Sequence, residues 1–161
     1  MAARGRADNS GRSSRCSHPQ KAELTWQDYE EHSHEGVVAF DAWYEGLPDI
    51  HKPHAKGELI ALRTLAKQGR IIEGNTDQLK PIVADPDVWE LKWKILGTKI
   101  RQYHAEPSAV PAHLVDLHSH VKETIRGDHD FENEKQNEHI GWAVLRYRAG
   151  ERSNWGISDR H

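Results

Sequence analysis

Apolar and polar residues alternate with a period of two through the middle of the chain. Within residues 88–95, the apolar side chains Trp89, Leu91, Trp93 and Ile95 are separated by charged ones. Alternation of this kind predicts a strand that is buried on one face and polar on the other. The same period returns in the stretch that follows.

Three more strands are predicted around this one. A short strand is expected at 24–29, and two longer ones within 99–106 and within 114–125. The links at 96–98 and 107–111 are too short for helical crossovers, so the last three strands are expected to form an antiparallel meander.

A helical period predicts three helices. The first spans 37–48, and the second lies within 49–70 and ends at Gly69, which is placed as a C′ glycine. The third lies within 132–149 and is followed by Gly150 as its C-cap. The residues of the last two helices that are expected to be buried are Leu59, Leu62, Leu65, Ala66, Ile140, Trp142 or Ala143, Leu145 and Tyr147.

The order of these elements predicts an α+β fold, with two N-terminal helices packed on a small antiparallel sheet and a C-terminal helix. One domain is expected at 23–150, between a disordered basic tail at 1–22 and a flexible tail at 151–161. The strand residues expected to be buried against the helices are Trp89, Leu91, Trp93, Val115, Leu117 and Val121, with Glu90 and Lys94 expected in water.

The charge of the chain is uneven, although the formal net charge is only −3. Residues 23–51 carry eight acidic residues and no Lys or Arg, whereas residues 52–101 have a net charge of +4. The basic middle is compatible with nucleic acid as a partner. The single cysteine, Cys16, rules out an intrachain disulfide. With neither an apolar run of membrane-spanning length nor a signal-peptide pattern, we expect a cytoplasmic protein without membrane partners.

The polar faces of the three longer strands gather ionisable side chains. Lysine and arginine hold phosphates, and His, Tyr or Lys can transfer protons, so this face suits a polyanion. The alternative is a solvated face of the kind that antiparallel sheets commonly leave to water. The residues assigned to this face are Glu90, Lys92, Lys94, Lys99, Arg101, Tyr103, Asp116, His118, His120 and Lys122.

A metal centre is the other chemistry that histidines suggest. His118 and His120 form a His-x-His pair, and His51 and His54 lie three residues apart at a predicted helix start. Neither pair has a third ligand at a recognisable spacing, and there is no Gly-rich phosphate loop or serine nucleophile elbow. We therefore predict no metal site and no cofactor.

Four motifs resemble those of the RelE/ParE toxin superfamily, and within it the HigB-like branch. They are LRTLAKQG at 62–69, WELKW at 89–93, KIRQYH at 99–104 and LHSHVKET at 117–124, and they keep the family's order over residues 36–149. The resemblance implies a RelE-like fold.

The same resemblance implies the toxin of a type II toxin–antitoxin system. Its activity would be that of a metal-independent, ribosome-dependent mRNA endonuclease that inhibits translation and is neutralised by a cognate helix-turn-helix antitoxin. Arg101 matches the family's strand arginine, and Lys122 matches the first lysine of its Lys-Lys-Thr motif. Glu123 replaces the second lysine, and His120 replaces the usual Phe.

The catalytic residues expected on this basis are Arg101, Lys122, His118 and His120, and the RNA-binding residues are Lys92, Lys94, Lys99 and Tyr103. Replacing Arg101 with Ala is expected to abolish activity and to leave the melting temperature nearly unchanged. Two alternatives stay open: a ParE-like gyrase inhibitor, or a degenerate phage-derived protein that only binds an antitoxin-like partner.

Overall fold

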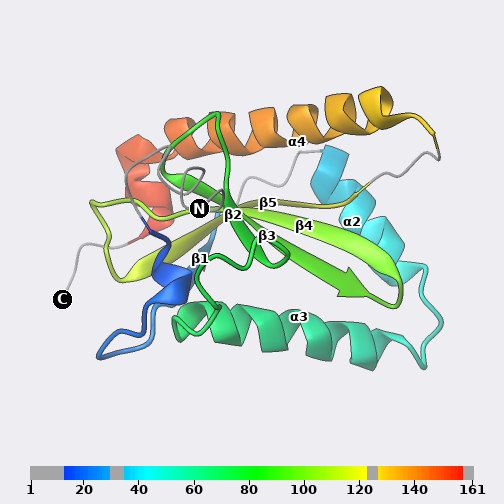
Figure 1. The fold of residues 1–161 in the computed structure, drawn as a ribbon, viewed down its shortest axis with the longest axis horizontal. Helices are drawn as coiled ribbons and strands as arrows, with labels where there is room; N and C mark the ends of the chain where they lie inside the picture. The colour runs from blue at the N-terminus through cyan, green and yellow to red at the C-terminus, as the bar shows by residue number, and fades with distance from the viewer. Residues whose placement is uncertain (1–12, 30–34, 123–126, 158–161) are drawn as a thin grey trace.

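The computed structural model describes residues 13–29, 35–122 and 127–157. These residues form one five-stranded sheet in the order β1-β5-β4-β3-β2, with helices on both sides (Figure 1). The strands are β1 (Thr25–Asp28), β2 (Leu79–Pro81), β3 (Val88–Ile95), β4 (Thr98–Ala105) and β5 (His113–Val121). The helices are α2 (Glu35–Glu45), α3 (Lys52–Lys67) and α4 (His129–Ala149), with short 3-10 helices η1 (Arg15–Ser17) and η2 (Glu151–Gly156).

The antiparallel meander β3-β4-β5 is confirmed. Its first turn holds Leu96 and Gly97 at φ values of 50° and 79°, as a tight hairpin turn requires. The prediction of a purely antiparallel sheet is wrong, because β1 pairs with β5 in parallel. These two strands are far apart in sequence, so local alternation carries no information about their pairing. The short edge strand β2 was not predicted.

Helices cover both faces of the sheet. Leu62 and Ala66 of α3 pack with the tryptophans of β3 in one core cluster, and Ala143 and Tyr147 of α4 pack with residues of β4 and β5 in the other. Figure 1 shows the sheet between α3 and α4. The polar face expected in water is therefore largely covered by α4, and Glu90 is fully buried against expectation, whereas Lys94 is exposed.

A bulge in β5 changes which side chains share a face. Tyr103 pairs with His118 and His104 pairs with Asp116, so Leu117 is an extra residue in β5. Val115 and Leu117 consequently belong to the core cluster on the α4 side, opposite the tryptophans of β3. Their burial was predicted correctly, but the prediction of a single shared apolar face is wrong. Val121 is only half-buried.

Asp116 also departs from the expected face. Its partner His104 contacts the ring of Trp26, which packs in the core cluster on the α3 side. The bulge lies between Asp116 and His118, so the aspartate is separated from the two histidines with which alternation had grouped it.

The helix ends follow the predicted signals. Pro53 lies in the first turn of α3, and Gly69 follows its end with φ of 70°. Asp128 caps α4 by accepting a hydrogen bond from the Phe131 amide, and the helix begins at His129, three residues before the earliest start that we predicted. Gly150 caps its C-terminus, as expected.

The buried side of each helix differs in part from the prediction. Leu62, Ala66, Ala143 and Tyr147 are buried, and Leu59 and Ile140 are half-buried. Burial of Leu65 and Leu145 was predicted wrongly, because both are exposed, and of the alternatives Trp142 and Ala143 it is Ala143 that is buried. The side of α4 that meets the sheet includes Arg146, whose Nη1 donates to the Leu117 carbonyl at 2.7 Å. A buried arginine cannot be recognised from apolar spacing.

Segments near both termini pack on the domain, contrary to the predicted tails. Ser14 and Cys16 are buried near the start of the described chain, and Trp155 and Ile157 near its end. The predicted disorder at 1–22 is thus wrong for 13–22, and the predicted flexibility at 151–161 is wrong for 151–157. The other residues of these two predicted tails lie outside the described residues. Within the described residues, the helices are too short or too polar to span a lipid bilayer.

Candidate functional site

The pairing of β3 with β4 brings basic side chains directly opposite each other. Lys92 faces Arg101, and Lys94 faces Lys99. Lys122 joins them just after β5, where its amide donates to the Lys99 carbonyl at 2.8 Å. We call these five residues and Lys80, which pairs with Glu90 in the register of β2, the cationic cluster.

The charges of the cationic cluster repel one another. Like charges opposite each other across neighbouring strands are destabilising. The pKa of Lys92 is lowered by burial and by the charges of Lys80 and Arg101. The pKa of Lys122 is lowered by burial and by Arg101 and Lys99. A bound anion would relieve this repulsion.

A buried carboxylate lies among these cations. Glu90 Oε2 lies 3.3 Å from Nε of Arg101, and Oε1 lies 3.7 Å from Nζ of Lys80. Gln136 of α4 donates to Oε2 at 2.9 Å. Arg101 is 7% exposed and also donates to the Ile100 carbonyl. Its guanidinium therefore has a structural role that the sequence did not indicate.

Next to Arg101, three histidines and a tyrosine form a layered group that we call the histidine stack: Tyr103, His118, His120 and His139. The rings of His120 and His139 lie face to face with centroids 3.7 Å apart. His118 Nε2 lies 2.8 Å from His139 Nδ1, and the Tyr103 hydroxyl lies 3.2 Å from His120 Nε2. The prediction that His118 and His120 lie together beside Arg101 is thus confirmed.

Burial keeps His118 and His120 uncharged. Loss of water around the rings lowers the pKa of His118 to about 4 and that of His120 to about 2, with the charge of His139 as the second cause in each case. Burial, followed by the charge of Glu90, raises the pKa of Tyr103. Both strand histidines are therefore neutral at pH 7, and they are weak bases as long as they stay buried.

Helix α4 covers the histidine stack. His118 and His120 are each 1% exposed, and Tyr103 is fully buried. The residue that covers them, His139, was missed by sequence reasoning. Its spacing of four and seven residues from the buried Ala143 and Arg146 is the signal that places it on the sheet side of α4.

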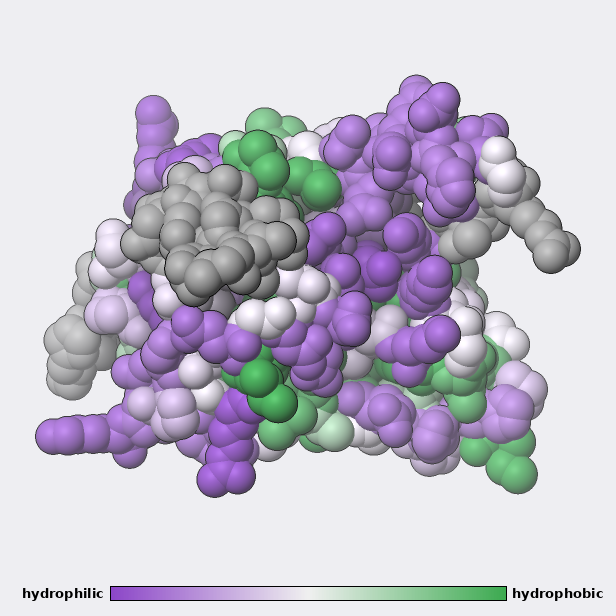
Figure 2. Space-filling view, viewed as in Figure 1, coloured by the Kyte–Doolittle hydropathy of each residue, from purple (hydrophilic) through white to green (hydrophobic). Residues whose placement is uncertain are grey.

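Grooves border the cationic cluster on two sides. One, of about 590 Å³, is lined by Lys92, Lys94, Lys99 and Arg101 together with residues of α3. The other, of about 690 Å³, includes Lys122 and runs between β2 and α4. In Figure 2, hydrophilic surface gathers over the first half of α4 and below it. The more exposed lysines of the cluster are thus accessible to an anion, whereas the histidines are not.

A pair of aspartates forms a separate acidic site that the sequence did not suggest. Asp28 and Asp116 are partners in the β1–β5 register, and Arg63 donates to Asp28 at 3.0 Å. Burial raises the pKa of Asp116 to about 7; Arg63 lowers it and Asp28 raises it. Both aspartates line a cavity of about 280 Å³ beside α2, and His118 lines the same cavity.

Comparison of the chain with family models, with curated proteins and with solved structures finds no match.

Proposed function

We propose that this protein is the toxin of a type II toxin–antitoxin system and cleaves messenger RNA on the ribosome without a catalytic metal. The observation that carries the proposal is the register of β3 and β4, which sets Lys92 against Arg101 and Lys94 against Lys99. Paired cations of this kind are stabilised by a polyanion that lies along the strands. The substrate, the ribosome dependence and the helix-turn-helix antitoxin are inferred from the resemblance of the strand motifs to those of HigB-like toxins.

The cationic cluster binds the RNA backbone in this proposal. Lys92, Lys94 and Lys99 hold phosphates along the chain, and Lys122 holds the phosphate that reacts. Arg101 supports that phosphate from the floor of the cluster, because it is mostly buried and already paired with Glu90. Its donors stabilise the charge that develops in the transition state.

The histidine stack supplies proton transfer. A neutral His120 accepts the proton of the ribose 2′-hydroxyl as its oxygen bonds to phosphorus, and the bond to the 5′-oxygen breaks. The 5′-oxygen takes a proton from water. The Val121 carbonyl orients His120 by accepting from Nδ1 at 3.2 Å, and the Tyr103 hydroxyl, 3.2 Å from Nε2, must turn away to free that nitrogen. Because α4 covers these rings, His139 must move aside before RNA reaches them.

The test is cleavage of a defined messenger RNA by the purified protein on ribosomes, mapped by primer extension. We expect Lys122→Ala to reduce the cleavage rate by about 10²–10³-fold. Lys21→Ala is the matched control, because Lys21 is exposed in the loop before β1. Protein that has been stripped of metal with a chelator and then dialysed should cleave at the parent rate on untreated ribosomes, at a temperature where the stripped protein stays folded. A Lys122→Ala variant as active as the parent contradicts the proposal.

The requirement for movement of α4 has its own control pair. His139→Ala uncovers the histidine stack and should maintain or raise the cleavage rate, whereas His129→Ala, exposed at the start of the same helix, should leave it unchanged. Substitution of both His118 and His120 by Gln should slow cleavage by about 10²–10⁴-fold. If His139→Ala abolishes cleavage in a folded protein, the covering role assigned to this residue is wrong.

One observation favours a second candidate, a degenerate relative that binds an antitoxin-like partner or nucleic acid without cleaving it. Arg101 is paired with a buried carboxylate, and both strand histidines are buried. Such a protein retards RNA in a salt-dependent way but leaves messenger RNA intact on ribosomes. A ParE-like activity is distinguished by inhibition of DNA gyrase in vitro.

A further inference from the structure

The segment around Cys16 is fixed to the end of β4 by many contacts. Arg15 donates its guanidinium to the carbonyls of Pro107 and His113 at 2.6 and 2.8 Å. Its amide donates to Glu106 Oε1 at 2.7 Å, and the Ser14 hydroxyl donates to Oε2 at 2.6 Å. The segment that looked like a tail in the sequence is thus held in one position, and its cysteine is fully buried.

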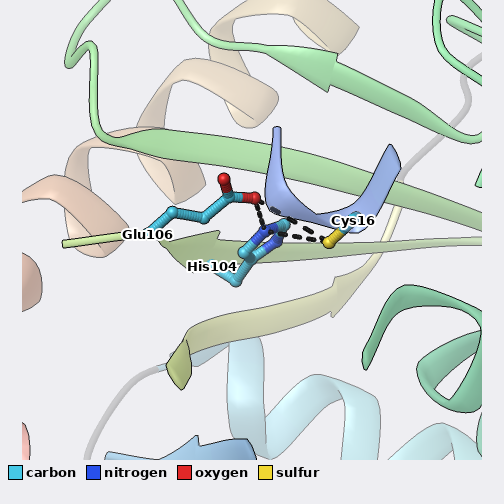
Figure 3. Close-up of side chains that lie close together, drawn as sticks. All are labelled: Cys16, His104 and Glu106. Carbon is cyan, nitrogen blue, oxygen red and sulfur yellow. Dashed lines mark hydrogen bonds and ion pairs between the residues drawn. The ribbon is translucent and has the colours of Figure 1, made fainter. Parts of the chain in front are cut away.

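Three potential metal ligands converge at this position. Figure 3 shows the Cys16 side chain pointing at those of His104 and Glu106, which come from the end of β4 and the residue after it. The Cys16 Sγ lies 3.6 Å from Nε2 of His104 and 3.8 Å from Oε2 of Glu106. Nε2 and Oε2 lie 2.8 Å apart. His104 is fully buried, and Glu106 is 5% exposed.

These separations resemble the edges of a zinc tetrahedron. Zinc–ligand bonds of about 2.3 Å to sulfur and about 2.0–2.2 Å to nitrogen or oxygen give edges of roughly 3.6 Å to sulfur and roughly 3.4 Å between nitrogen and oxygen. Both sulfur edges agree with this geometry. The nitrogen–oxygen edge is shorter because His104 and Glu106 are at hydrogen-bond distance, and a bound ion would replace that bond.

We propose that Cys16, His104 and Glu106 bind one Zn²⁺ ion that fastens the N-terminal segment to the sheet. The donor set fits zinc, which binds thiolate, imidazole and carboxylate. A dication with one thiolate and one carboxylate is also electrically neutral, which favours binding in a buried place. Ser14 Oγ, 2.6 Å from Oε2, offers an oxygen for the fourth position, which a water molecule can also fill.

Binding exchanges a proton for the ion. Burial, followed by the charge of Glu106, raises the pKa of the Cys16 thiol, so the thiol is protonated in the absence of metal. Formation of the sulfur–zinc bond therefore releases one proton per ion to solvent, and no oxidation or reduction takes place.

The same trio is poorly arranged as a thiol catalyst. A catalytic cysteine, histidine and acid use both ring nitrogens of the histidine, one toward the sulfur and one toward the acid. Here Cys16 and Glu106 lie against the same nitrogen of His104, and the sulfur is fully buried. A closed structural metal site is the better fit. His104 of this site lies three residues along β4 from Arg101, about 10 Å away, with its side chain on the other side of the sheet.

The test uses Co²⁺ as the probe in place of zinc. Cys16 is the only cysteine of the chain, so a thiolate-to-cobalt charge-transfer band can arise from this site alone. We expect the metal-free parent protein to bind one equivalent of Co²⁺ with this band, to lose the band on addition of Zn²⁺, and to melt at a higher temperature with Zn²⁺. Glu106→Gln and His104→Gln should each weaken Co²⁺ binding at least about tenfold.

The control is a protein in which both His51 and His54 are replaced by Gln. These histidines are an exposed pair at the start of α3, and the band should persist without them. Cys16→Ser should abolish the band and the thermal shift. The parent protein decides the result by itself: if it is folded by circular dichroism and shows no charge-transfer band, the trio is a hydrogen-bonded cluster only and the proposal is wrong. A band that survives Cys16→Ser also overturns it.

Discussion

Replacement of Arg101 by Ala should destabilise the protein, because the structure pairs this residue with a carboxylate that is fully buried. Sequence reasoning expected the melting temperature to stay nearly unchanged. Nε of Arg101 lies 3.3 Å from Oε2 of Glu90, and Glu90 is 0% exposed. Removing one member of a buried ion pair leaves a buried charge uncompensated and typically costs about 3–5 kcal/mol.

Two neighbours reduce the expected cost in this protein. Lys80 Nζ stays 3.7 Å from Glu90 Oε1, and Gln136 still donates to Oε2. The expected loss in the free energy of unfolding is therefore near the lower end of the usual range for a broken buried ion pair, at about 3 kcal/mol. With a slope of about 1–3 kcal/mol per molar urea, the midpoint of unfolding should fall by about 1–3 M.

Urea unfolding followed by tryptophan fluorescence measures this effect, since the chain has six tryptophans. Lys99→Ala is the matched control: Lys99 is an exposed cation of the same strand, and its loss should change the free energy of unfolding by less than about 0.5 kcal/mol. The double variant Arg101→Ala with Glu90→Gln should recover about 0.5–3 kcal/mol through the coupling of the two sites. An Arg101→Ala variant as stable as Lys99→Ala would refute the argument.

Three further predictions concern stability. Folding keeps His118 neutral, so the free energy of unfolding has its full value above pH 6.5 and should fall by about 3 kcal/mol as the pH drops to 4. The difference between the pH profiles of the parent and of His118→Gln isolates this loss, and two parallel profiles would contradict it. Leu117→Ala should lower the free energy of unfolding, measured with denaturant, by about 2–5 kcal/mol, whereas Leu145→Ala, at an exposed position, should lower it by less than about 0.5 kcal/mol. Equal losses would mean that Leu117 is not buried. Gly69→Ala should lower the melting temperature, because Gly69 has φ of 70° and a Cβ there would overlap the His18 carbonyl; an unchanged melting curve would show that the N-terminal segment does not dock against α3.

Hydrophobic periodicity alone identified most of the elements. The alternation in Val88–Ile95 predicts β3, and the short links on either side of β4 predict the meander. Pro53 and Gly69 mark the ends of α3 because each has a restricted or unusual backbone preference that acts locally. Properties of this kind depend on neighbours in sequence, and the sequence therefore determines them.

Only the tertiary structure shows on which face a strand residue lies wherever a bulge breaks the two-residue period. One extra residue, Leu117, turns Val115 and Leu117 to the α4 side and separates Asp116 from His118. A bulge inserts a residue without changing composition, so a pattern of alternating residues conceals it. The strand basic residues and the two histidines were nonetheless grouped correctly, because each of these strand segments lies on one side of the bulge.

The surroundings of the candidate residues also came only from the tertiary structure. The sequence places Arg101, His118 and His120 on one face, but it does not tell that Glu90 is buried against the arginine or that His139 of α4 covers the histidines. Cys16 and His104 meet across 88 positions of sequence. Contacts of this kind depend on how helices and termini pack on the sheet, and that packing is set by the fold of the whole chain and not by any local pattern.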